Sequence, residues 1–196
     1  MPRYVDADER RQHVARAVWR VVLRDGFGAA SVRAVATEAG LSAGSLRHYF
    51  GTQEELREYA LALADARMTA RMTRVDRTGT VREVVERLLW ASLPMDEESI
   101  ELYRIWYSFL VESRGRLREL VTDASREALD LTREALDALR EGGEIAASVD
   151  VDTATTELNA LLEGLSLQAV VFGDHVTPDL IRATVRAWLD RLRPPG

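Results

Sequence analysis

Apolar residues recur at helical spacing along almost the whole chain. Between residues 81 and 89, for example, the valines and leucines follow one another at intervals of three and four: Val81, Val84, Val85, Leu88 and Leu89. Because an α-helix turns once in about 3.6 residues, side chains at this spacing share one face. No stretch of useful length alternates apolar and polar residues as a strand does. The pattern predicts an all-α protein of about nine helices.

Capping residues and glycines place the boundaries of the first helices. Asp6 or Asp8 can cap a helix that runs to about Leu23 and ends at Gly26, and short helices follow Ser31 and Ser42.

Two capping boxes mark the next helices. Thr52 with Glu55 opens a helix to about Met72, and Thr80 with Glu83 opens the helix that carries the valine stripe. In a capping box, each of the two side chains satisfies the free backbone N–H of the other residue.

Four longer segments complete the chain. Residues 97–113 are apolar nearly all round, which is typical of a central, enclosed helix. Residues 115–141 carry a wide apolar stripe, and the last helices span about 151–172 and 178–192, the latter capped by Thr177. The stripe of the 115–141 helix consists of Leu117, Val121, Ala124, Ala128 and Leu131.

Composition excludes several classes of protein. The 196 residues include no cysteine, so disulfides and thiolate metal sites are excluded. No apolar run reaches the ~18 residues of a membrane span, and the charged start "MPRYVDADERRQ" lacks a signal-peptide core. We therefore expect a cytoplasmic protein that contacts no membrane and holds no metal or cofactor.

The distribution of charge is more informative than its total of −6. Residues 1–50 hold eight arginines against five acids, a net +3, so the rest of the chain carries −9. A basic N-terminal quarter on an acidic body is compatible with nucleic-acid binding by that quarter alone.

Residues 31–50, "SVRAVATEAGLSAGSLRHYF", predict a helix-turn-helix. Gly40 suits the left-handed turn after the first short helix, Leu41 fills the gap between the helices, and Ser42 caps the second. The second helix of such a motif fits the major groove of DNA, which is about 12 Å wide.

The same residues carry a family resemblance. Residues 14–59, and above all "GFGAASVRAVATEAGLSAGSLRHYFGTQEEL", resemble the DNA-binding domain of the tetracycline-repressor (TetR) family of bacterial regulators. Residues 158–173, "LNALLEGLSLQAVVFG", and the final amphipathic helix resemble more loosely the dimerisation helices of the branch that includes the choline–betaine regulator. The resemblance implies a DNA-binding domain at 1–52 and a ligand-binding and dimerisation domain at 53–196.

Carried over position by position, the resemblance implies a set of DNA contacts. We expect Arg47 to read a base edge, most often that of guanine. The family usually has lysine at position 53, where this chain has glutamine, so the phosphate contact there falls to Gln53 without charge. The implied contacts are Ser31, Arg33, Ala43, Gly44, Ser45, Arg47, Tyr49, Thr52 and Gln53.

Phe50 of this segment is expected to be a core residue. His48 is expected to face the interior or the rim of the small domain, with a DNA-backbone contact as the alternative. Ser45 and His48 are three residues apart and resemble a nucleophile–base pair, but nothing in the sequence orients the histidine. We therefore expect no catalytic residue and no enzyme activity.

Aromatic and methionine side chains gather in the second domain, where the resemblance implies a pocket for a small-molecule effector. They could line such a pocket or, singly, fill the helical core. The candidates are Met68, Met72, Trp90, Tyr103, Trp106, Tyr107 and Phe109.

The last two helices are expected to form a homodimer interface, although part of their apolar stripes must cover the chain's own core. The candidates are Leu158, Leu161, Leu162, Gly164, Leu165, Ala169, Ile181, Val185, Trp188 and Leu189. The sequence thus predicts a dimeric repressor that binds a palindromic DNA operator and is released by an effector. An activator, a regulator controlled by a partner protein, and a ligand-binding protein or enzyme without DNA binding stay open as alternatives.

Overall fold

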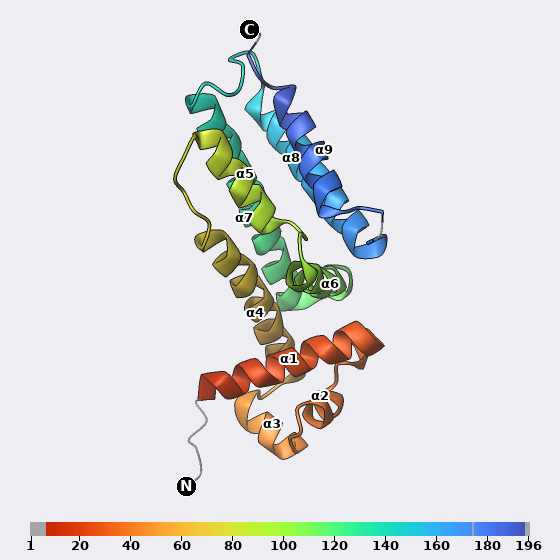
Figure 1. The fold of residues 1–196 in the computed structure, drawn as a ribbon. Coiled ribbons are helices and arrows are strands. Elements are labelled where there is room, and N and C mark those ends of the chain that lie inside the picture. Colours follow the sequence, from red (N-terminus) through yellow and green to blue (C-terminus); the bar gives the residue numbers. More distant parts are fainter. Residues whose placement is uncertain (1–6, 174, 195–196) are drawn as a thin grey trace. The chain divides into compact units, whose positions relative to one another are not determined.

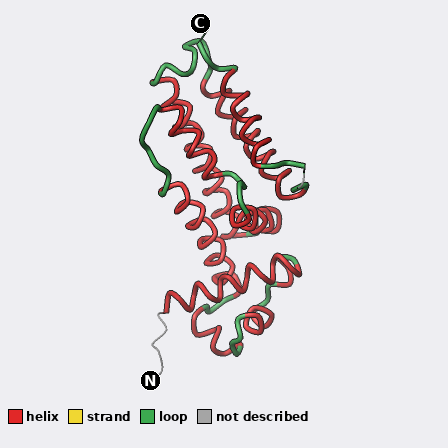
Figure 2. The backbone as a smooth tube through the Cα atoms, in the orientation of Figure 1, coloured by secondary structure: helices red, strands yellow, loops and turns green. Residues whose placement is uncertain are grey.

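The computed structural model describes residues 7–173 and 175–194, and these form nine α-helices, one short 3-10 helix and no strand (Figures 1 and 2). The prediction of an all-α fold is confirmed. The helices are α1 (Ala7–Asp25), η1 (Phe27–Ala29), α2 (Val32–Glu38), α3 (Ala43–Tyr49), α4 (Gln53–Thr73), α5 (Val81–Ser92), α6 (Glu97–Glu112), α7 (Gly115–Glu141), α8 (Val151–Val171) and α9 (Pro178–Asp190). None of the described helices is both long and apolar enough to cross a membrane.

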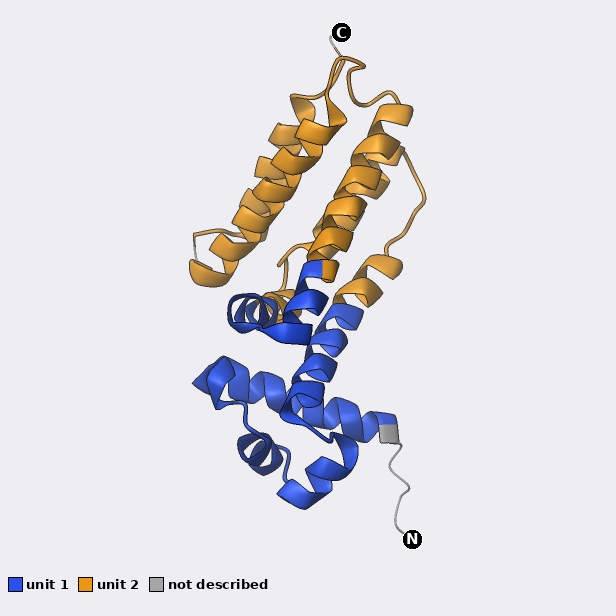
Figure 3. Ribbon diagram, turned by 180° about the vertical axis from the view of Figure 1, so that it is seen from behind, with its two compact units in different colours: residues 1–67, 104–122 blue, residues 68–103, 123–196 orange. Residues whose placement is uncertain are grey.

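Two compact units divide the chain (Figure 3). Unit 1 comprises residues 1–67 and 104–122, and unit 2 comprises residues 68–103 and 123–196. The division falls inside α4, α6 and α7, so each of these helices contributes residues to both units. The boundary expected after residue 52 lies within unit 1, at the start of α4.

The core of unit 1 joins the N-terminal helices to residues from much later in the chain. Trp19 of α1 is buried, and its indole N–H donates to the carbonyl oxygen of Ala60 at 2.9 Å. Phe109 of α6 is fully buried and packs edge-on against Phe27, with 5.2 Å between the ring centroids. The guanidinium of Arg57 lies 4.4 Å from the Phe27 ring centroid and donates to the Phe27 carbonyl. The core of unit 1 is therefore built from two distant stretches of sequence.

The core of unit 2 is formed by one face each of α5, α7, α8 and α9. Leu89, Leu136, Leu158 and Ile181 are representative members, one from each helix. A buried arginine adds two ion pairs to this apolar core, because Arg82 bonds to the largely buried carboxylate of Glu86 at 2.9 Å and to the exposed carboxylate of Asp190 at 2.8 Å.

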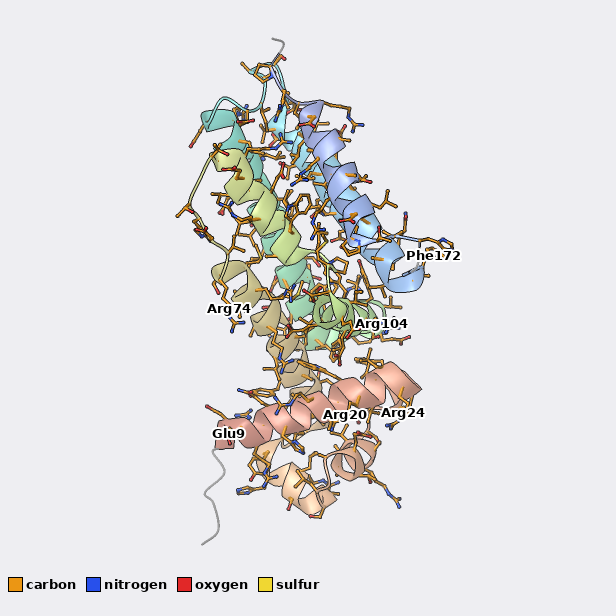
Figure 4. The ribbon with its side chains drawn as sticks, viewed as in Figure 1. Glu9, Arg20, Arg24, Arg74, Arg104 and Phe172 are labelled. Carbon is orange, nitrogen blue, oxygen red and sulfur yellow. The ribbon has the colours of Figure 1, made fainter. Side chains whose placement is uncertain are left out.

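Two helices bury less of their apolar surface than their sequences indicate. We expected α6 to be enclosed, but Val111 is 69% exposed and Glu101 is exposed as well. Arg104 also faces solvent (Figure 4). The acids and arginine of α6 therefore mark an outer face that the apolar run obscures. On α7, the second half of the expected stripe is exposed at Ala128 and Leu131.

The helix caps agree with the sequence in most details. Thr80 and Glu83 form the predicted reciprocal box, and the Thr177 hydroxyl accepts from the N–H of Leu180. The predicted box at the start of α4 forms only by half. Thr52 Oγ1 accepts the N–H of Glu55 at 3.0 Å, but the Glu55 carboxylate accepts from the N–H of Gly51 rather than of Thr52. Asp6, one of the two caps considered for α1, lies outside the described residues.

Candidate nucleic-acid interface

A tight turn connects α2 to α3 as the sequence predicts. Gly40 has φ +65°, a conformation that strains any residue with a Cβ. The N–H of Leu41 donates to the Ala36 carbonyl at 2.8 Å, and the N–H of Gly40 to that of Thr37 at 3.1 Å. This pair of bonds satisfies the last carbonyls of α2 and reverses the chain. Ser42 then caps α3 by accepting the N–H of Ser45 at 3.0 Å.

Large side chains hold α3 from one side only. Leu46 and Phe50 are fully buried, as expected for Phe50. The Arg11 guanidinium from α1 lies 5.0 Å from the Phe50 ring centroid and 4.8 Å from that of Tyr59. Cation–π contacts of this kind add to the packing that fixes the helix. The anchored side of α3 thus determines which residues it presents outward.

The outward residues of α3 are small or polar, and we call them the reading face: Ala43, Gly44, Ser45, Arg47 and His48. Arg47 is exposed and has no hydrogen bond or ion pair to any residue that the structure describes. Tyr49 is half-buried at the edge of this face.

His48 does not pack as expected. Its imidazole is exposed, and its ring contacts that of Tyr49 edge-on at 5.5 Å between centroids. The expectation was wrong because only Leu46 among the last four helical residues turns inward. The helical spacing from Leu46, which the sequence already contains, is the signal that could have found His48.

The candidate DNA-contact residues outside α3 differ in whether their side chains already have hydrogen-bond partners within the protein. Arg33 is exposed, whereas the Ser31 and Thr52 hydroxyls each accept a backbone N–H as helix caps. The Gln53 amide donates to the Ala30 carbonyl at 2.8 Å, so its N–H group already has a partner within unit 1. Arg57 donates to the same carbonyl at 3.4 Å.

An ion cluster ties α1 to the end of α2. Arg20 and Arg24 both project from α1 (Figure 4) and bond to Glu38 at 2.7 and 2.8 Å. The hydrogen bonds from Arg24 and then Arg20 hold the pKa of the Glu38 carboxyl below its ordinary value. Both arginines of α1 are therefore engaged with Glu38. The exposed arginines of α2 and α3 are Arg33 and Arg47.

The residues considered for an effector pocket fall in both units. Met68, Met72, Trp90 and Tyr103 belong to unit 2, and the remaining three, Trp106, Tyr107 and Phe109, belong to unit 1. Phe109 serves the core of unit 1. The hydroxyl of Tyr103 donates to the Ser92 carbonyl at 2.7 Å, and burial raises the pKa of this hydroxyl.

The expected dimer residues require a correction. Most of them are buried beneath side chains of the same unit, so they have little or no surface to offer a second copy. These are Leu158, Leu162, Leu165, Ala169, Ile181, Val185, Trp188 and Leu189, whereas Leu161 and Gly164 are partly exposed. The apolar residues that α8 and α9 do expose include Leu167 at 48%, Val171 at 58% and Leu180 at 47%. Phe172, the C-cap of α8, also projects outward (Figure 4).

A capped short helix that is anchored by buried side chains and presents polar residues after a glycine turn defines a helix-turn-helix protein. Two family matches make the class more specific. Residues 16–60 match the bacterial regulatory proteins of the tetR family, and residues 81–194 match the C-terminal part of BetI-type transcriptional repressors. The chain therefore belongs to the TetR family of bacterial transcriptional regulators.

Individual relatives agree with this membership. The chain is 34% identical to the HTH-type transcriptional regulator PksA of Bacillus subtilis, over 98% of this chain and 94% of that protein. It is 31% identical to the HTH-type nicotine-responsive transcriptional repressor HdnoR of Paenarthrobacter nicotinovorans, with 94% and 96% covered. A solved transcriptional regulator of Pseudomonas aeruginosa PAO1 has a TM-score of 0.83 at 26% identity, covering 96% of this chain and 92% of that one.

Proposed function

We propose that this protein is a homodimeric repressor that acts in the cytoplasm, binds a palindromic DNA operator through α3, and releases it when a small-molecule effector binds. The observation that carries the proposal is the two-sided character of α3. Its inner residues are fully buried, while its reading face consists of small or polar residues and has cationic and hydrogen-bonding side chains without partners among the described residues. This arrangement suits a helix that inserts into a groove.

Arg47 is the residue we assign to a base edge. A guanidinium donates two parallel hydrogen bonds to O6 and N7 of guanine, and one such pair discriminates against the wrong base by about 1–3 kcal/mol. We assign Ser45, Tyr49 and Arg33 to phosphate oxygens, because such contacts fix the register of the protein but carry no sequence information. Gln53 would contribute through its backbone more than through its engaged amide.

The exposed apolar residues of α8 and α9 support the dimer. On each helix they recur at intervals of three, four or seven residues and therefore share one side, opposite the buried stripe. Small residues among them allow close approach of helices from a second copy. The proposed interface consists of Ala160, Gly164, Leu167, Val171, Leu180, Ala183 and Ala187. A two-fold dimer would place two copies of α3 about one turn of DNA, ~34–36 Å, apart.

Release by an effector follows from linkage. A ligand that binds one conformation of the body better shifts the population toward it, and operator affinity falls by the ratio of the two ligand affinities. The relative HdnoR is a nicotine-responsive repressor, and this supports a small-molecule effector for the present protein. Because α4 contributes residues to both units, it is the segment we expect to transmit the change.

The test starts from an operator selected from random double-stranded DNA with the wild-type protein. Arg47→Ala should abolish selective binding of this DNA in a gel-shift titration, because the guanidinium supplies the base contact. Arg104→Ala is the matched control, since it removes another exposed arginine, from α6. Unchanged specificity in Arg47→Ala would contradict the assignment.

The alternatives make different predictions. An activator or a partner-controlled regulator would bind the same operator, but reporter expression would rise with it or would not respond to small molecules. A ligand-binding protein or enzyme without a DNA role would have no salt-dependent DNA affinity, because phosphate contacts must weaken as salt rises.

A further inference from the structure

The geometry of α3 singles out His48 rather than Arg47 as the centre of the reading face. Successive residues of an α-helix are rotated by about 100°. Measured from the fully buried Leu46, Arg47 lies about 100° around the helix, while Gly44 and His48 lie at about 160° and 200°. The direction opposite the anchor therefore passes between Gly44 and His48, which are one turn apart.

The imidazole of His48 is available to an outside group. It is exposed, and neither ring nitrogen bonds to a residue within the described ranges 7–173 and 175–194. Its edge-on contact with Tyr49, at 5.5 Å between centroids, restricts the direction in which the ring projects. An imidazole N–H is a donor, and the base edges of the major groove that carry acceptors are chiefly those of the purines.

Gly44 supplies a second, independent observation. A Cβ added there would meet only the Ser42 hydroxyl oxygen, at 3.8 Å, and the residue has an ordinary negative φ. The fold therefore does not require glycine at this position, and glycine costs helix stability relative to alanine. Its missing side chain instead leaves space on the outside of α3, directly beside His48.

We propose that His48 reads a base in the major groove by donating a hydrogen bond to an acceptor of guanine, N7 or O6, and that Gly44 provides the clearance for this approach. The proposal rests on the proposed function and adds a base contact to that of Arg47. His48 thereby determines the preference at one base pair of each half-site, separate from the pair that Arg47 reads.

The experiment compares binding-site selections from random double-stranded DNA for the wild type and His48→Ala. We expect the variant to lose the guanine preference at one position of each half-site, to keep the others, and to bind the wild-type operator about tenfold or more weakly. His48→Gln should change that position toward adenine, whose N6 and N7 an amide can contact together. Thermal unfolding followed by circular dichroism checks that both variants fold.

His175→Ala is the matched control, because it removes another exposed histidine, from the segment between α8 and α9. Its selected sites should equal those of the wild type. Identical preferences at every position in His48→Ala would overturn the inference, and so would a uniform loss of affinity with a smaller salt dependence, which identifies a phosphate contact. In either case the proposed function stands as long as the wild type selects a site and Arg47→Ala does not. It fails if the wild type selects no site, and its assignment of Arg47 fails if Arg47→Ala selects the same site.

Discussion

The helices α3 and α8 share one design but expose opposite chemistry. Each buries one face in the core of its own unit, α3 through Leu46 and α8 through Leu158 and its neighbours. Outward, α3 presents Arg47 and His48, whereas α8 presents Leu167 and Val171. The buried faces of the two helices are therefore alike. Only the outer residues distinguish a surface suited to the charged groove of DNA from a surface suited to another protein.

The difference has an energetic basis. Exposure to water costs polar side chains little free energy, so the reading face of α3 is stable in solvent without a covering partner. Exposed leucine and valine gain about 25 cal/mol for each Å² removed from water, so the outer face of α8 favours a permanent contact. We therefore expect DNA binding to respond to salt and effector, and the dimer to persist through both states.

The largest expected effect separates the two faces of α8. Leu158→Ala should lower the free energy of unfolding by about 2–5 kcal/mol, because it leaves a cavity in the core of unit 2. Leu167→Ala on the outer face should cost much less when measured at the same protein concentration. Urea unfolding followed by circular dichroism gives both values. Equal losses would mean that the two faces of α8 are not distinct.

A charge on the outer face should break the dimer without unfolding the chain. Leu167→Glu combined with Val171→Glu places two desolvated carboxylates in the proposed interface, which is costly for an unpaired charge. Light scattering coupled to size exclusion should report a monomer with a helical spectrum. Leu131→Glu, on an exposed site of α7, is the control and should stay dimeric. A dimeric double variant would place the interface elsewhere.

The hydroxyl of Tyr103 in α6 tests how much a partly buried hydrogen bond contributes to the stability of unit 2. Tyr103→Phe should cost about 1 kcal/mol near pH 7, because the Ser92 carbonyl loses its donor. Burial raises the pKa of Tyr103 in the folded state, so the unfolded chain ionises first, near pH 10. The contribution is present below that pH and is lost as the pH rises. The gap between wild type and variant should therefore narrow in unfolding titrations above pH 10; a constant gap would contradict the assigned cause.

The smallest expected effect on folding lies on the reading face. Gly44→Ala should raise the free energy of unfolding by about 0.5–1 kcal/mol, because alanine favours helix and the fold has space for its Cβ. Operator affinity should nevertheless fall, since the methyl group occupies the clearance beside His48. Thermal unfolding and gel-shift titration measure the two changes. An increase in both the free energy of unfolding and the operator affinity would contradict the proposal that Gly44 provides clearance for DNA.

The sequence was sufficient for α3 because its two faces differ in kind. Gly40, Ser42, Leu46 and Phe50 each have a local role that spacing reveals, and the structure confirms the turn, the cap and the anchors. The direction of His48 was missed because aromatic rings occur both in cores and at contacts, and the prediction weighted its chemistry above its angle from Leu46.

The outer faces of α8 and α7 could not be assigned in the same way. On α8 both faces carry leucine, so periodicity finds an apolar helix but not the side that the chain itself covers. On α7 the stripe leaves the core after Val121, and Leu136 and Leu139 replace Ala128 and Leu131 as the buried residues. This change of the buried face along α7 depends on which other helices pack against each turn. The sequence of α7 alone does not contain that information.

The contact between Phe27 and Phe109 has a consequence for modularity. The helix-turn-helix lies in the first quarter of the chain, but the hydrophobic cluster of its unit is completed by Phe109 of α6, some eighty positions later. A transplant of residues 1–67 onto a foreign body would leave Phe27 without the aromatic ring that packs against it. The portable unit for engineering a new sensor is therefore discontinuous: residues 1–67 travel with residues 104–122 or not at all.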